Sequence, residues 1–485
     1  MAYQIRVLPQ QCNISAEAGD DLLTCLRSAG LMEDAPCGGN GSCGKCKVLV
    51  NGEQKLACQT KIDGDMVVTV PQALPQQILT QGIDLPPTSA KERHSWALAL
   101  DIGTTTVVGY LLQGSTAVGC QSRRNPQTAF GADVITRIRH ALQGQQDALT
   151  ACIRQCVNDL TLALCREARI CPDQLETVCF VGNPAMQQFF LGIPPANLVQ
   201  LPFPPMLTQA RLVPAIHYIP CCHNARLQIV PDIAGFVGAD LLAGILSTGM
   251  DRADDMTLLV DIGTNGEMVL GNRHRLVACS TAAGPALEGG NISCGLRARA
   301  GAIDHAWAEN DRIGCHVMGG VTAEGICGSG LIDATASALE LGWINKRGRV
   351  LTPDHCIPLI DGLCLTQADI RQLQLAKGAI CAGIVLLAQQ LDIQIEQIQR
   401  VYLAGAFGSC LDPKCACRIG LLPPALEHRI TAVGNAAGSG AKLLAFDPNA
   451  LAYAQQLLSR IEFTELAQLP AFPKTFAREM GFAVP

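Results

Sequence analysis

The chain has 485 residues, of which 48% are hydrophobic and 16% are charged. This balance excludes a disordered chain, and the length suggests roughly three domains. The formal net charge is −6 and Lys and Arg do not cluster, so nucleic acid is not an expected partner. Because the N-terminus lacks the apolar core of a signal peptide, we expect a cytoplasmic protein whose 24 cysteines are mostly reduced thiols.

Residues 1–75 predict a small metal-binding domain. Residues 3–8 alternate like a strand, and residues 20–29 have helical spacing with Gly30 as the stop signal. Four cysteines follow in a C-x5-C-x2-C-x11-C pattern: Cys37, Cys43, Cys46 and Cys58. Plant-type ferredoxins group their 2Fe–2S ligands in nearly this way, with four residues in the first gap.

Two kinds of metal centre fit four thiolates: a 2Fe–2S cluster and a structural zinc ion. Zinc sites usually consist of two spaced cysteine pairs, whereas here only Cys43 and Cys46 form such a pair. Glycines surround the cysteines and allow the loop to turn its backbone N–H groups toward the sulfurs. The pattern therefore favours 2Fe–2S over zinc.

A linker is predicted at residues 76–94. This stretch belongs to a longer segment, from Pro71, that contains four prolines, several Gln and no sustained periodicity. Such a composition favours a semi-flexible tether. An electron carrier that must visit two partners needs this kind of reach, so we expect the linker to matter for function.

A strand, a tight polar turn and a second strand follow at residues 96–110, and residues 257–271 are a near copy. Both copies contain the tetrapeptide Asp-Ile-Gly-Thr, at 101–104 and 261–264. Asp, Gly and Thr are also common in ordinary hairpin turns, but an internal repeat is read before any single motif. The duplication predicts two related lobes that face one phosphate ligand.

Each hairpin has the residues that a magnesium–nucleotide site needs. Gly103 and Gly263 lack a Cβ, so the backbone can turn sharply and approach an anion. Successive N–H groups and Thr hydroxyls can then form an anion-binding concavity. Asp101 and Asp261 would repel a phosphate directly, and so they indicate an intervening Mg²⁺. The expected phosphate contacts are Gly103, Thr104, Thr105, Gly263, Thr264 and Asn265.

The remaining chain alternates strands, helices and Gly-rich turns. We expect helices at 147–168, at 185–191, within 231–246, from Gly328 onward and at 434–446, and strands at 177–181 and from Val401 into a glycine turn. Residues 198–220 are proline-rich and are expected to be irregular. The most apolar helical stretch, 378–391, is too short to span a bilayer, so no membrane is expected as a partner.

Two further turns in the second half are candidate parts of the site. Gly284 and Glu288 lie in the sequence AGPALEG. Glu288 is a candidate for orienting the attacking water, and a solvated loop carboxylate is an equally good interpretation. Gly328, Ser329 and Gly330 begin a long helix, whose N-terminal N–H groups could meet a ligand.

The two hairpins and the later LAGAFG sequence resemble the nucleotide-binding superfamily of actin, sugar kinases and heat-shock chaperones. This resemblance implies an α/β actin-like ATPase with two duplicated lobes, residues 95–250 and 251–485. Asp101 and Asp261 then begin the two phosphate motifs. The resemblance also implies adenosine contacts from the later glycine turn, at Gly405, Ala406 and Gly408.

The whole arrangement looks like the reductive activators of corrinoid proteins: an α+β ferredoxin-like (β-grasp) domain, a linker and this ATPase. Members use ATP to drive one electron from a 2Fe–2S cluster onto inactive cob(II)amide, which restores the cob(I)amide nucleophile of a methyltransferase system. The resemblance implies ATP, Mg²⁺ and 2Fe–2S as cofactors. It implies a corrinoid protein as partner, an upstream donor such as a ferredoxin, flavodoxin or reductase, and compatibility with a homodimer. Many relatives have an extra small domain before the first hairpin, where this chain has only a tether.

Other interpretations stay open at this point. A redox-regulated small-molecule kinase would need a base for its substrate, and Asp232 or Asp240 could serve. An activator of 2-hydroxyacyl-CoA dehydratases has a similar ATPase but holds one cluster between two subunits. A redox-sensing module would have an inactive ATPase. Separately, Cys410, Cys415 and Cys417 could bind a second metal centre, whose fourth ligand is not identified, or be incidental thiols.

Overall fold

The described part of residues 2–70 contains a five-stranded sheet and helix α1. The computed structural model describes residues 2–32, 39, 41, 46–70, 79–84, 95–263 and 265–483. The strand order of the first sheet is β2-β1-β5-β3-β4, with β1 and β5 parallel, which is the β-grasp arrangement predicted from the sequence. The strands are β1 (Ala2–Leu8), β2 (Cys12–Glu17), β3 (Lys47–Val50), β4 (Glu53–Leu56) and β5 (Met66–Thr69).

Helix α1 (Leu22–Ser28) packs against this sheet, as its sequence predicts. Its apolar face consists of three buried leucines, Leu22, Leu23 and Leu26. The carboxylate of Asp21 accepts a hydrogen bond from Thr24 N and caps the first turn. The chain leaves the helix through Gly30, whose φ of +69° favours glycine.

Two six-stranded sheets form the rest of the fold, and they share one topology. Their orders are β10-β11-β9-β6-β7-β8 and β21-β20-β12-β13-β14-β22. In each sheet, three consecutive antiparallel strands include the Asp-Ile-Gly-Thr hairpin, and two parallel strands extend the sheet on the other side. This confirms the duplicated actin-like architecture. The strands of the first sheet are β6 (Trp96–Ile102), β7 (Thr106–Gln113), β8 (Thr116–Arg124), β9 (Leu175–Val181), β10 (Arg211–Pro214) and β11 (Arg226–Ile229).

The second sheet has one strand that the first does not match. Strand β22 pairs in parallel with the outer side of β14. The strands are β12 (Thr257–Ile262), β13 (Gly266–Gly271), β14 (Leu276–Thr281), β20 (Arg400–Ala404), β21 (Ile430–Gly434) and β22 (Ile461–Phe463). Two small sheets belong to the same half of the chain: β15 (Ala302–Glu309) with β16 (Arg312–Val317) and β17 (Gly325–Ile326), and β18 (Cys356–Pro358) with β19 (Cys364–Thr366).

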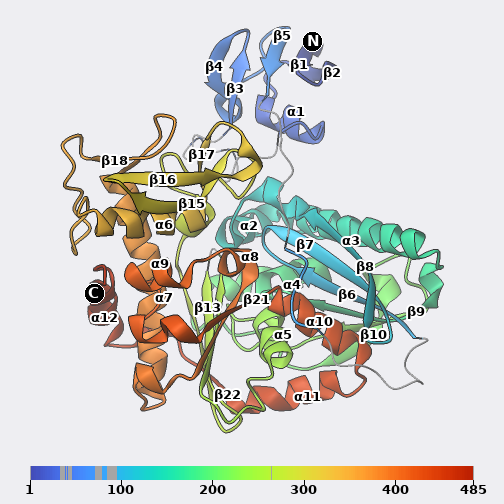
Figure 1. The fold of residues 1–485 in the computed structure, drawn as a ribbon. Helices are drawn as coiled ribbons and strands as arrows, with labels where there is room; N and C mark the ends of the chain where they lie inside the picture. Colours follow the sequence, from blue (N-terminus) through green and yellow to red (C-terminus); the bar gives the residue numbers. More distant parts are fainter. Residues whose placement is uncertain are drawn as a thin grey trace.

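Helices cover both large sheets, and the N-terminal sheet stands outside them (Figure 1). Arg27 of α1 donates a hydrogen bond to Ala129 O, shortly before α2, at 3.1 Å. The helices of the first half are α2 (Val134–His140), α3 (Gln146–Ala168), α4 (Pro184–Leu191) and α5 (Ala239–Thr248). Those of the second half are α6 (Gly328–Glu340), α7 (Gln367–Gln390), α8 (Gly405–Ser409), α9 (Pro413–Arg418), α10 (Ala436–Phe446), α11 (Ala450–Leu457) and α12 (Phe472–Glu479).

Helices α5 and α10 lie between the two lobes and cross closely (Figure 1). A Cβ added to Gly440 of α10 would lie 2.0 Å from Ala243 O of α5, so only glycine allows this approach. One hydrophobic cluster joins both helices to Val108 of the first sheet and Leu259 of the second. The small residues in these helices therefore serve an interface between the lobes.

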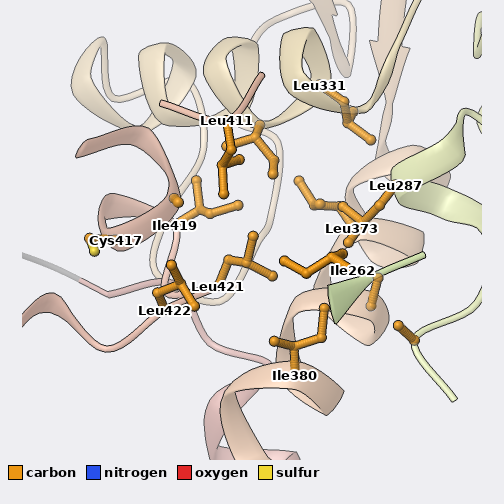
Figure 2. Close-up of a cluster of buried hydrophobic side chains, with 14 of the residues drawn as sticks. Ile262, Leu287, Leu331, Leu373, Ile380, Leu411, Cys417, Ile419, Leu421 and Leu422 are labelled. Carbon is orange, nitrogen blue, oxygen red and sulfur yellow. The ribbon is translucent and has the colours of Figure 1, made fainter. Parts of the chain in front are cut away.

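The core of the second lobe holds its hairpin in place (Figure 2). Ile262, at the end of β12, is buried in one cluster with Leu287, Leu373 and Ile380. The side chain of Ile262 follows directly after Asp261, so packing of the hydrophobic neighbour fixes where the carboxylate points. The corresponding Ile102 is fully buried in the core of the first lobe.

The structure differs from the sequence-based expectations in three places. Residues 198–220 are not wholly irregular, because β10 pairs with β11 there. The glycine turn after Val401 is the short helix α8. The apolar stretch 378–391 belongs to the 24-residue α7, so its predicted length was wrong. Among the described residues, α7 alone is long and apolar enough to cross a membrane, but 78% of its apolar window is buried inside the protein.

Candidate functional site

The first hairpin turn is held by backbone and amide hydrogen bonds. Gly103 N donates to Thr106 O at 2.9 Å, and a Cβ on Gly103 would lie 3.0 Å from that oxygen. Asn125 donates from Nδ2 to Gly103 O at 2.8 Å, and its backbone N donates to Thr105 O at 2.9 Å. The turn is therefore rigid before any ligand binds, and Asp101 enters it from the end of β6.

Thr104, at the tip of the same turn, is held by two side chains that sequence reasoning missed. Arg137 Nη2 donates to Thr104 O at 2.6 Å, and Asn183 Nδ2 donates to Thr104 Oγ1 at 3.0 Å. Arg137 is fully buried. Burial, with smaller contributions from the like charges of Arg124 and Arg297, lowers the pKa of Arg137 to about 10. Arg137 still carries its positive charge at neutral pH, directly behind the expected phosphate position.

The second hairpin turn, in the other lobe, is one residue shorter than the first: Ile262 pairs with Gly266, whereas Ile102 pairs with Val107. Gly263 N donates to Asn265 O at 2.9 Å, and Thr264 lies outside the described residues. Glu288 reaches this turn, since a Cβ on Gly263 would lie 3.9 Å from Glu288 Oε1. Gly405 approaches from α8: its φ is +83°, and a Cβ there would lie 2.9 Å from Asp261 Oδ1. Glycine at 405 thus leaves room for the Asp261 carboxylate.

Several carboxylates converge between the two hairpins. The pKa of Asp101 is raised to about 6, mainly by burial; the 2.7 Å hydrogen bond from Asn435 Nδ2 opposes this rise, and the Asp261 charge contributes to it. Burial likewise raises the pKa of Asp261 to about 6 and that of Asp240 to about 7. The pKa of Glu267, which pairs with Asp261 across the hairpin, is raised by burial and by both neighbouring Asp residues. Such crowding of acids is favourable only when a cation neutralises them.

A magnesium–nucleotide complex fits this charge pattern. Within the described residues, no three His, Cys, Asp or Glu side chains are grouped tightly enough to ligate one ion by themselves. Mg²⁺ commonly takes only one or two carboxylates, with waters and phosphates completing the shell. Asp101 and Asp261 are the two carboxylates that would hold the ion, and both are only partly exposed. Arg137 and the two glycine turns suit the phosphates.

The other expected nucleotide contacts have mixed environments. Gly284 has a φ of +76° and open space around it. Gly328, Ser329 and Gly330 are buried: a Cβ on Gly328 would lie 1.9 Å from Leu287 O, and Ser329 Oγ donates to Asp304 O at 2.8 Å. Packing of α6 therefore already explains these small residues. In α8, Gly405 and Ala406 have exposed surface, whereas Gly408 is buried against Leu403.

Asp240 and Asp232, the two candidate bases of the kinase interpretation, are placed differently. Asp240 joins the carboxylates described above, where the charges of Asp261 and Asp101 contribute to its raised pKa. Asp232 is 3% exposed and accepts a 2.5 Å hydrogen bond from Gln187 Nε2. Burial raises the pKa of Asp232 well above its ordinary value. A buried carboxyl group is poorly placed to act on a diffusing substrate.

Two of the four predicted cluster ligands lie together in the N-terminal domain. Cys46 Sγ and Cys58 Sγ are 3.2 Å apart, and both residues are buried. Gln59 Nε2 points at Cys58 Sγ from 3.7 Å, and Gly39 packs against the Cys58 side chain. Cys37 and Cys43 lie outside the described residues. A converged, unbridged thiol pair with an N–H donor at its edge fits one side of a metal–sulfur centre.

Cys410, Cys415 and Cys417 do not converge. Cys417 is buried among Ile419 and Leu422 and points its thiol at Pro423 O (Figure 2). The Cys415 thiol interacts with Asp333, which contributes to raising its pKa beyond the effect of burial, whereas Cys410 is exposed. The described geometry therefore favours packing or incidental thiols over a second metal centre.

The fold and this site define a class: a two-lobed, actin-like ATPase joined to a ferredoxin-like domain. Residues 96–253 match the middle region of the RACo family, and residues 255–484 match its C-terminal ASKHA domain. The corrinoid activation enzyme RamQ of Eubacterium limosum is 33% identical over 433 residues, covering 82% of this chain and 72% of RamQ. The chain belongs to this family, the reductive activators of corrinoid proteins.

Two other similarities agree with that assignment. A [Co(II) methylated amine-specific corrinoid protein] reductase of Methanosarcina barkeri is 31% identical over 257 residues, covering 48% of this chain and 45% of the relative. The solved structure of a reductive activator for corrinoid, iron–sulfur protein superposes with a TM-score of 0.70 at 27% identity, covering 99% of this chain and 98% of that one. The activity of the family is the ATP-dependent reductive activation of corrinoid proteins, and this favours that interpretation over the kinase and inactive-ATPase interpretations. Its ferredoxin-like region and ATPase indicate iron–sulfur and ATP as cofactors.

Proposed function

We propose that this chain uses Mg–ATP to transfer one electron from a 2Fe–2S cluster to the cob(II)amide of a corrinoid protein. The cluster would be held by Cys37, Cys43, Cys46 and Cys58. It supplies a one-electron carrier when bound. The observation that carries the proposal is the convergence of Asp101 and Asp261 from two lobes of a chain whose separate N-terminal domain holds a buried thiol pair.

The need for ATP follows from redox potentials. Plant-type 2Fe–2S centres lie near about −400 mV, and the family resemblance implies that cob(II)amide is harder to reduce than that. Each ~59 mV of mismatch lowers a one-electron equilibrium constant tenfold. A ligand can shift such an equilibrium only through different affinities for two states. We propose that Mg–ATP closes the lobes and changes how the corrinoid protein is bound, including its cobalt ligation.

The residues between the two hairpins would have separate roles in nucleotide binding and in hydrolysis. Asp101 and Asp261 would hold the Mg²⁺ from opposite lobes, and N–H groups of the two hairpin turns would bind the phosphates. Glu288 lies beside the second turn, where it can orient a water molecule for attack on the terminal phosphate. Hydrolysis then releases the lobes. An upstream one-electron donor, such as a ferredoxin, flavodoxin or reductase, returns the electron to the N-terminal domain, and we place this cycle in the cytoplasm.

The direct test mixes the reduced protein, Mg–ATP and a cob(II)amide-containing corrinoid protein, and follows the absorbance of cob(I)amide. We expect cob(I)amide only when nucleotide is present, and less than a tenth as much without it. Cob(I)amide that forms equally well without nucleotide would refute the coupling. Transfer of phosphate to a small metabolite, with no cobalt reduction, would favour a kinase instead.

A further inference from the structure

Part of the predicted tether is built into the ATPase. Residues 79–84 are described, and they lie against both lobes. Tyr110 of β7, in the first lobe, donates from its hydroxyl to Thr80 O at 2.8 Å. Asn435 N, between β21 and α10, donates to Gln81 O at 2.7 Å. Residues 80–84, which we name the strap, are therefore not free chain at this point.

The strap fits its position tightly. A Cβ on Gly82 would lie 2.4 Å from Ser439 Oγ and 2.5 Å from Asn435 O, so a larger residue has no room. Gly434 has a φ of +66°, and a Cβ there would lie 2.4 Å from Gln81 O. Two glycines, one on each side, thus permit this close approach. The Asp84 carboxylate faces Lys442, whose Nζ lies 5.1 Å from the centre of the Tyr110 ring.

Asn435 connects the strap to the nucleotide site. Its Nδ2 donates to Asp101 Oδ2 at 2.7 Å and lies 3.3 Å from the hydroxyl of Tyr110. Its Oδ1 accepts from Gly438 N at 2.6 Å, which fixes the orientation of the amide. The Nδ2, the Oδ1 and the backbone N of Asn435 are therefore all hydrogen-bonded. Their partners lie in β6, in α10 and in the strap, respectively.

We propose that Asn435 is a positioning residue for Asp101, and that the strap couples the iron–sulfur domain to the nucleotide through it. The inference rests on the proposed function, because it takes Asp101 as a ligand of the magnesium–nucleotide complex. Binding of Mg–ATP to the Asp101 carboxylate would fix or shift the Asn435 side chain, which is hydrogen-bonded to that carboxylate. Because the backbone N–H of Asn435 donates to Gln81 O, the position of the strap would change or become fixed as well. By reciprocity, displacement of the strap must change the affinity for nucleotide by the same factor.

The first test displaces the strap without touching the site. We expect Gly82→Ala to change the Kd for Mg–ATP, measured by calorimetry, at least about fivefold, the lower range of measured couplings, and to lower the cob(I)amide formed per ATP hydrolysed. Gly64→Ala is the matched control, because Gly64 has an ordinary φ and open space around its Cα. Thermal unfolding of both variants separates coupling from simple destabilisation. An unchanged Kd and yield in a folded Gly82→Ala protein would overturn the proposal.

The second test measures the reverse direction by amide hydrogen exchange. We expect a non-hydrolysable ATP analogue with Mg²⁺ to slow exchange in residues 79–84 of the full chain at least about threefold. In Asn435→Ala, saturating analogue should leave exchange there unchanged. Identical exchange of residues 79–84 with and without analogue in the native chain would refute the proposed coupling between the strap and the nucleotide site. If exchange of residues 79–84 depends on nucleotide but cobalt is not reduced, the proposed function would be refuted and the coupling through the strap would be supported.

Discussion

Asp101 and Asp261 ionise with difficulty in the absence of a cation. Each has its pKa raised to about 6 from an ordinary value of 3.8, mainly by burial. Above about pH 6 both are charged and the folded state is penalised, and this penalty disappears as the pH falls below about 4. The two residues therefore reduce the stability of the nucleotide-free protein at neutral pH and become favourable when Mg²⁺ binds.

We predict opposite effects of Asp101→Asn on activity and stability. ATP hydrolysis should fall by about a hundredfold or more, comparable with the loss of one transition-state contact. The unfolding temperature at pH 8, without Mg²⁺ and nucleotide, should rise by about 2–4 °C, because a buried like charge is removed. Differential scanning fluorimetry and an ATPase assay measure both. Asp354→Asn, at an exposed site, is the control. Reduced stability together with full activity would contradict the role of Asp101.

We also predict that Mg–ATP binds more weakly as the pH falls. Asp261 and Asp101 take up protons near pH 6, and Asp240 near pH 7, so their affinity for Mg²⁺ declines below neutrality. The KM for Mg–ATP should rise about tenfold between pH 7.5 and 5.5. In Asp101→Asn the rise should be smaller, and this variant corrects for protonation of ATP itself. A KM that stays constant over this range would argue against the carboxylate ligands.

At the scale of elements, the strands and helices with strong periodicity were predicted well. The hairpins at residues 96–110 and 257–271 alternate apolar and turn residues, and both formed as expected. Helix α3 coincides closely with the predicted 147–168. Strand β10 escaped prediction, since its four residues, three of them exposed, pair with β11 only in the folded protein. Local pattern carries no information about such pairing.

The residues that position the site residues could largely not be predicted from the sequence. Arg137 is one of three basic residues in the last turn of the short helix α2. Nothing in the sequence pattern shows that this one is buried behind Thr104. Asn435 joins Asp101 across 334 positions of the chain. One signal was available: Gly-Asn follows a parallel strand at 182–183 and again at 434–435, and both asparagines cap helices beside the first hairpin.

Helix α8 provides a prediction at this scale. Gly405→Ala should raise the KM for Mg–ATP about tenfold, because the new Cβ would crowd Asp261 Oδ1. Gly249→Ala shares the unfavourable positive φ, +67°, but meets no atom within 4 Å. Both variants should lose about 1 kcal/mol of stability from backbone strain, measured by urea unfolding. Equal KM values in the two variants would show that crowding of Asp261 has no consequence.

At the scale of the whole molecule, the two activities are carried by separate sheets. The Cys46–Cys58 pair belongs to the β-grasp domain, while the carboxylates belong to the two lobes. Among the described residues, Arg27 of the β-grasp domain contacts the first lobe directly. The strap, which follows the β-grasp domain in the chain, contacts both lobes. Electron transfer and ATP hydrolysis should therefore be separable by substitution, even though they are coupled in the native chain.

We predict that Cys58→Ser abolishes the reduction of cob(II)amide and retains nucleotide binding. The iron content and the 2Fe–2S spectroscopic signal should be lost, because one of four thiolates is removed. Binding of Mg–ATP, measured by calorimetry, should stay within about threefold of the native value. Cys12→Ser is the matched control, since Cys12 lies in the same domain outside the predicted ligand set. A Cys58→Ser protein with full iron content would exclude this ligand set.

Strand β22 has a consequence for how the chain must be handled and made. Residues Ile461–Phe463 cover the outer side of β14, and Thr464 N donates to Ala278 O at 2.8 Å. Until these last residues emerge from the ribosome, β14 presents a row of unpaired backbone groups beside buried apolar side chains. Nascent or C-terminally shortened chains should thus associate with one another through that open edge, and recombinant preparations cut near residue 460 should form aggregates rather than monomers with a missing tail.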